Sequence, residues 1–166
     1  PLFGKIVDGD VVLNELGEIV QEEWIRSIEI RKEIDFDKWV IMPNHIHGIV
    51  IISSGGANGG SPVVFNDKHV GACSRAPGMP DINGNNRACS RAPLRESPFS
   101  LKPNTIGSFV AGFKSICSKR INILRSTPGA PLWQRNYYEH VIRDEREMNK
   151  IRRYIINNPA KWEFTP

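Results

Sequence analysis

Two histidines separated by one residue, His45 and His47, are the side chains of this chain best suited to chemistry. Side chains alternate across a β-strand, so both imidazoles would leave one face of the apolar strand that continues to Ile52. Imidazole is the commonest metal-binding side chain, and the pair follows a Pro-Asn turn rather than lying deep in a core. Two half-buried structural histidines are the alternative. Because two ligands do not hold a metal, a third group must come from elsewhere in the chain.

The second candidate group is Tyr154, on a predicted helix that begins after the cap residue Asp144 and stops at Pro159. Residues four apart share a helix face, so Tyr154 and Asn158 are neighbours one turn apart. A packing tyrosine explains this helix when it is considered alone. Together with the histidine pair, however, a phenol nucleophile, an amide oxygen that can bind metal and a basic surface suit attack on a DNA phosphodiester.

Three segments of the chain resemble the REP-associated tyrosine transposases, which belong to the single-tyrosine HUH transposases (two histidines flanking a bulky hydrophobic residue). They are MPNHIHG at 42–48, WQRNYYEHVIR at 133–143 and YIINNP at 154–159, and the resemblance covers roughly residues 1–53 and 101–163. It implies metal-dependent cutting and joining of single-stranded DNA at palindromic hairpin repeats through a covalent 5′-phosphotyrosine intermediate. By matching position, it implies His45 and His47 as catalytic metal ligands. It likewise implies Asn158 as the third ligand and Tyr154 as the nucleophile.

The resemblance also implies an α+β fold, a ferredoxin-like antiparallel sheet flanked by helices. The residue patterns predict the same kinds of element: a hairpin over residues 5–13, a helix after Asn14, and strands over 34–42 and 45–52 that form a hairpin in the middle of a sheet. They also predict a basic amphipathic helix over 106–124 and the last helix after Asp144. We therefore expect one domain over residues 1–166.

Residues 54–100 interrupt this pattern with a composition rich in Gly, Pro, Ser and Asn. Such a composition offers little apolar surface for a core, so we expect a long flexible insertion that can be deleted without loss of fold. It contains the duplicated sequence ACSRAP at 72–77 and 88–93. Because Cys73 and Cys89 belong to this repeat, we assign them no chemical role.

Charge is distributed unevenly along the chain. Residues 1–53 hold five Lys or Arg against ten Asp or Glu, whereas residues 101–166 hold twelve against five. A basic third of this kind predicts a surface for a polyanion, with a solvated helical face as the alternative. The residues expected to contact DNA phosphates are Lys114, Lys119, Arg120, Arg152 and Arg153.

The remaining sequence features bear on the cellular compartment, the metal ion and the binding partner. No apolar run reaches the about 18 residues of a membrane span, and three cysteines without close spacing favour a reducing cytoplasm. The mixed nitrogen and oxygen ligands suit Mg²⁺ or Mn²⁺. The expected partner is single-stranded or hairpin DNA, and we expect a monomer, with a dimer as the alternative.

Three other functions share parts of this pattern. A rolling-circle replication initiator or relaxase uses the same chemistry. The family usually has one further strand before the residues that match Pro1-Leu2-Phe3, so an inactive, truncated DNA-binding relative is a second alternative. A metal hydrolase that uses metal-bound water is the third, and in it Tyr154 would be dispensable.

Overall fold

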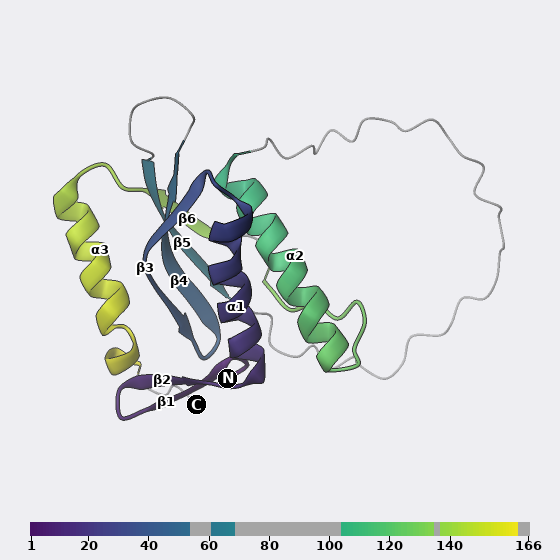
Figure 1. Cartoon of the computed structure of the whole chain (residues 1–166). Coiled ribbons are helices and arrows are strands. Elements are labelled where there is room, and N and C mark those ends of the chain that lie inside the picture. Colours follow the sequence, from purple (N-terminus) through teal and green to yellow (C-terminus); the bar gives the residue numbers. More distant parts are fainter. Residues whose placement is uncertain (54–60, 69–103, 135–136, 163–166) are drawn as a thin grey trace, which may run out of the picture.

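The computed structural model describes residues 1–53, 61–68, 104–134 and 137–162 and has an α+β fold (Figure 1). A small hairpin, β1 (Gly4–Val7) and β2 (Asp10–Leu13), precedes helix α1 (Glu15–Ile30). Strands β3 (Ile34–Met42), β4 (His45–Ile52) and β5 (Ser61–Lys68) follow. Helix α2 (Ile106–Leu124), strand β6 (Tyr138–Val141), helix α3 (Glu145–Asn157) and the 3₁₀ turn η1 (Pro159–Lys161) complete the described chain.

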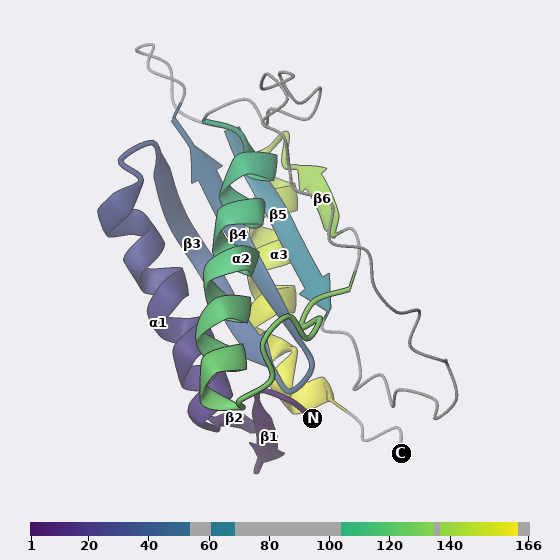
Figure 2. The same cartoon turned by 90° about the vertical axis from the view of Figure 1, so that its right-hand side faces the viewer.

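The main sheet is antiparallel throughout and has the strand order β3-β4-β5-β6. Figure 2 shows α1 and α2 in front of this sheet and α3 behind it. The expected hairpin is present as β3 and β4, but only β4 is an interior strand. The expectation that both strands lie in the middle of the sheet is therefore wrong for β3, which is an edge strand of the described sheet.

Local sequence explains where the first elements begin and end. Asp8 and Gly9 form the turn of the first hairpin, and both have positive φ, as tight hairpin turns require. Asn14 then caps α1, because its side-chain oxygen accepts the backbone N–H groups of Leu16 and Gly17. The predicted first hairpin and first helix are thus confirmed, as are α2 and α3 with the predicted cap Asp144. The structure adds Thr105 as the cap of α2.

The larger core lies between the sheet and helices α1 and α2. Trp24 of α1 is fully buried at its centre, stacked on Phe36 with ring centroids 4.2 Å apart. Gly48 of β4 lies beneath this indole: a Cβ built on Gly48 would come 2.7 Å from Trp24 Cζ2. Packing therefore explains why a glycine follows the histidine pair: a side chain here would collide with Trp24 on the opposite face of the strand from the histidines.

A smaller core lies between the sheet and α3. Ile49 of β4 and Ile155 of α3 are buried there together with Ile142. Ile49 lies on the same face of β4 as His45 and His47, because alternate residues share a face. The sheet thus separates the molecule into a larger core on one side and, on the other, the α3 face that carries both histidines.

The structure corrects one expectation about the insertion at 54–100. Residues 61–68 form β5, which lies between β4 and β6, and its Phe65 is fully buried while Val63 is 7% exposed. This part of the segment does contribute to the core, because Val63, Val64 and Phe65 supply an apolar run that the surrounding composition obscures. Residues 54–60 and 69–100, with the ACSRAP repeat, Cys73 and Cys89, lie outside the described residues.

Within the described ranges, no helix is both long enough and apolar enough to cross a bilayer.

Candidate functional site

The two histidines lie at the start of β4 on the face covered by α3. Both are buried, His45 to 6% and His47 to 4% exposure, and their rings meet edge to face with centroids 4.5 Å apart. Their Nε2 atoms are 2.8 Å apart. The strand periodicity predicted that the imidazoles share a face, and the structure brings the same nitrogen of each ring to one point.

Asn44 fixes the orientation of the first imidazole. Its Oδ1 lies 2.5 Å from Nδ1 of His45. An amide oxygen can only accept a hydrogen bond, so Nδ1 carries the proton and donates it. The lone pair of the neutral ring is then on Nε2, which points toward His47. Metal-binding histidines are commonly oriented by such a bond from their other nitrogen, and sequence analysis did not assign this role to Asn44.

Tyr154 lies against the second imidazole. Its ring meets that of His47 edge to face, with centroids 5.4 Å apart, while the side chain stays 57% exposed. Among the described residues, its hydroxyl makes no hydrogen bond. The structure therefore places an accessible phenol against one of the two converging imidazoles.

An apolar face and an ion pair with the edge strand β3 help to hold helix α3 over the sheet. Met148, Ile151 and Ile155 pack toward the sheet. Arg152 Nε donates to Asp37 Oδ2 over 2.7 Å, and Asp37 lies at the bulge of β3 between Phe36 and Trp39. The pair joins the middle of α3 to the edge strand, so it helps to fix the helix that carries Tyr154.

Asn158 lies at the C-terminal end of α3, between two residues that contact the histidines. Tyr154 precedes it by one turn, and Trp162 follows it with its ring 5.5 Å from that of His45. Within the described residues, no hydrogen bond involves the Asn158 side chain. Asn158 thus lies along the chain between these two contacts, and its role as a metal ligand stays a prediction. Trp162, which no periodicity in the sequence singled out, also contacts the histidine pair.

The donor atoms fit a divalent cation. Two nitrogen ligands at right angles, each about 2.1 Å from one ion, are about 3 Å apart, close to the separation of the two Nε2 atoms. In the described part of the chain, no three His, Cys, Asp or Glu side chains form a metal-binding group. Asn158, the third ligand that the resemblance implies, carries an amide oxygen and so is not one of these residue types.

The basic residues of α2 lie on the other face of the sheet from this site. Arg120 donates to Glu22 and Glu23 of α1, each over 2.7 Å, and these contacts raise the pKa of its guanidinium. Lys114 Nζ donates to the backbone oxygen of Gln134. Lys119 is exposed. Lys114 and Arg120 thus have structural partners. The sheet separates these two residues and Lys119 from the histidines.

Helix α3 carries a different set of cations. Arg152 is engaged by Asp37, whereas Arg153 is exposed and donates only to a backbone oxygen of its own helix. Arg146 and Lys150 share its outward face, at spacings of four and three residues. No carboxylate of the described residues pairs with any of the three. We call Arg146, Lys150 and Arg153 the α3 stripe.

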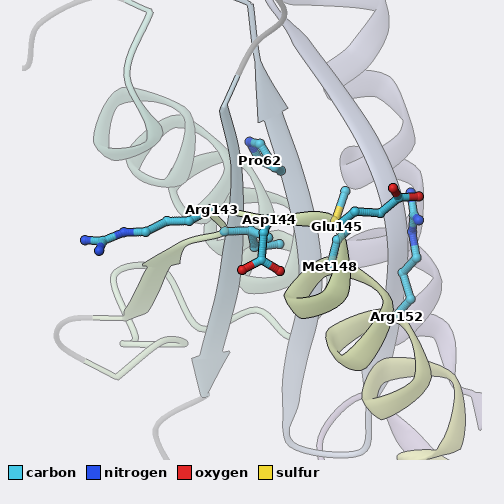
Figure 3. A pocket seen from close by; sticks show the side chains of 7 residues that line it. Pro62, Arg143, Asp144, Glu145, Met148 and Arg152 are labelled. Atoms are coloured by element: carbon cyan, nitrogen blue, oxygen red, sulfur yellow. The ribbon is translucent and has the colours of Figure 1, made fainter.

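A pocket of about 340 Å³ lies at the opposite end of α3 (Figure 3). The pocket reaches along the helix to Arg152, two positions before Tyr154, but neither Tyr154 nor the two histidines line it. Its lining residues are Pro62, Ile142, Arg143, Asp144, Glu145, Met148 and Arg152.

The described cysteine, Cys117, does not compete as a nucleophile. It is fully buried among the residues of the larger core. Burial, with the negative charge of Glu23 as a smaller cause, raises the pKa of its thiol far above the usual range. The thiolate is the reactive form of cysteine, so this side chain is a packing group.

Comparison with known proteins gives one relevant match. The chain is 31% identical over 162 residues to an uncharacterized protein of Haemophilus influenzae, and the alignment covers 98% of this chain and 74% of that protein. No protein-family model and no solved structure matches the chain.

Proposed function

The chain belongs to the same family as the Haemophilus influenzae protein, and we propose that it is a metal-dependent tyrosine transposase. It cuts and joins single-stranded DNA at palindromic hairpin repeats, acts in the cytoplasm and works as a monomer. The observation that carries this proposal is the convergence of His45, His47 and Tyr154 on one face of the sheet.

The protein supplies the metal ligands and their orientation. His45, held by Asn44, and His47 would bind the ion together with Asn158. When bound there, Mg²⁺ or Mn²⁺ would polarise the scissile phosphate. Burial of the two imidazoles keeps bulk water from their ring nitrogens.

Tyr154 supplies the nucleophile. The phenol loses its proton to solvent, and its oxygen forms a bond to phosphorus as the bond from phosphorus to the 3′ oxygen breaks. The departing oxygen takes up a proton and becomes a 3′-hydroxyl, while the 5′-phosphate stays on the tyrosine. Because one phosphate ester replaces another, a later 3′-hydroxyl can reverse the step and join strands without a nucleotide cofactor.

The α3 stripe supports a DNA substrate, since unpaired cations beside a candidate nucleophile offer contacts for phosphate groups. We place the substrate on this face in preference to the α2 side. Lys119 is the exposed cation among the three α2 residues first expected to bind DNA, and it lies beyond the sheet from Tyr154.

Incubation with a labelled single-stranded hairpin and Mg²⁺ or Mn²⁺, followed by denaturing electrophoresis, tests the proposal. A covalent protein–DNA adduct is expected with wild type, and none with Tyr154→Phe. Cleavage without an adduct would indicate a metal hydrolase, and a band shift without cleavage would indicate an inactive DNA-binding relative. Adduct formation on the same sequence without its hairpin would favour a replication initiator or relaxase.

Matched variants separate the two roles in the site. His45→Ala and His47→Ala should abolish cleavage while leaving hairpin binding and the melting temperature largely unchanged. Tyr138→Phe is the control for Tyr154→Phe, because it removes a hydroxyl from another exposed tyrosine. Equal cleavage by wild type and the double alanine variant would overturn the metal assignment.

A further inference from the structure

Tyr138 is an exposed aromatic residue on the same face of the sheet as the histidine pair. In the antiparallel register, Tyr138 of β6 pairs with Asn66 of β5, and Asn66 pairs with His47 of β4. Directly paired residues project to the same face, so Tyr138 and His47 belong to one row across the sheet. Two strand spacings, about 10 Å, separate their backbones.

Neighbouring Tyr137 has a different role. Its ring packs on Phe65 with centroids 5.6 Å apart and belongs with the larger core. Tyr138 is not among the residues that pack under α3, and 61% of it is exposed. Of two adjacent tyrosines, one therefore serves packing, while the other presents its ring to solvent beside the candidate centre.

An exposed ring at this place suits an unpaired nucleobase. Bases stack on aromatic side chains of single-strand binding proteins whatever their sequence, because every base has a π face. Duplex bases are already stacked and cannot use such a ring. A strand whose phosphate lies at Tyr154 would have neighbouring bases within reach of the same sheet face.

We propose that Tyr138 is a stacking platform for an unpaired base of the single-stranded DNA substrate, a few nucleotides from the phosphate at Tyr154. This inference rests on the proposed function for the identity of the substrate. The platform works through its ring, so phenylalanine replaces tyrosine and alanine does not.

Binding measured without cleavage tests this platform. Single-stranded oligonucleotides are titrated by fluorescence anisotropy with EDTA present, using Tyr154→Phe as the parent protein. Loss of one stacked base weakens binding by about 5- to 150-fold. Tyr138→Ala should therefore raise the Kd for the single strand by a factor in this range. Tyr138→Phe should stay within about twofold of the parent. Binding of a duplex of the same length should not change.

Val141→Ala is the matched control. Val141 lies on the same strand and is also exposed, but it pairs with Val63 and belongs to the opposite face, so its truncation should leave binding unchanged. A 2-aminopurine base placed at successive positions should be quenched at one position in the parent and unquenched with Tyr138→Ala.

Equal affinity of Tyr138→Ala and of the parent protein for the single strand would overturn the inference that Tyr138 is a stacking platform. Loss of binding with Tyr138→Phe equal to that with Tyr138→Ala would also overturn it, because the hydroxyl would then be the contact. Failure of the proposed function looks different: wild type would form no adduct with metal, while the dependence of binding on the ring of Tyr138 would stand.

Discussion

Phe65→Ala tests whether β5, a strand within a Gly- and Pro-rich segment, belongs to the core. Phe65 is fully buried, and its ring lies 5.9 Å from Trp24 and 5.6 Å from Tyr137. Removing a buried phenylalanine ring costs about 3–5 kcal/mol of unfolding free energy. Domains are stable by about 5–15 kcal/mol, so this one change should remove a large share of the total. At this chain length it should lower Tm by roughly 6–20 °C.

Urea unfolding followed by tryptophan fluorescence measures the change, because Trp24 and Trp133 are both buried reporters. Tyr138→Ala on the adjacent strand β6 is the control, and its effect should stay within about 0.5 kcal/mol because the side chain is mostly exposed. Replacing all of residues 54–100 by a Gly-Ser linker should unfold the domain, since β4 and β6 would lose the strand between them. A Phe65→Ala protein with the wild-type midpoint would refute the placement of β5.

Two further predictions concern packing and DNA binding. Gly48→Ala should lower the unfolding free energy by about 1–3 kcal/mol in the same urea assay, because its Cβ would overlap Trp24; an unchanged midpoint would show that the indole can move aside. Replacing Lys150 and Arg153 by glutamine should reduce the slope of log affinity against log salt by about 1.4 for a single strand, about 0.7 for each lost contact. The same replacement of Lys119 and Arg120 should leave that slope unchanged, and the opposite ranking would move the DNA surface to α2.

Local signals in the sequence were sufficient for most of the elements. The helix caps Asn14 and Asp144 lie where side-chain oxygens can accept early helical N–H groups, and both cap the predicted helices. The placement of His45 and His47 on one face followed from strand alternation alone. These features depend on neighbours within a few residues, which is why sequence patterns capture them.

Features that depend on distant partners were not predictable in this way. The basic spacing on α2 made Arg120 resemble a phosphate contact, but its carboxylate partners lie 97 and 98 residues earlier in the chain. Arg152 pairs with Asp37 across 115 residues for the same reason. In β5, a short apolar run was masked by the average composition around it. Trp162 reaches His45 only because η1 turns the chain back after α3.

Peptide mapping of the protein–DNA adduct shows directly whether Tyr154 is the nucleophile. Wild-type protein is incubated with a single-stranded hairpin substrate and Mn²⁺, digested with protease, and the peptide that carries DNA is identified by mass spectrometry. We expect a nucleotide attached through its 5′-phosphate to Tyr154. Attachment to Tyr137 or Tyr138, or cleaved DNA without any attached peptide, would contradict it.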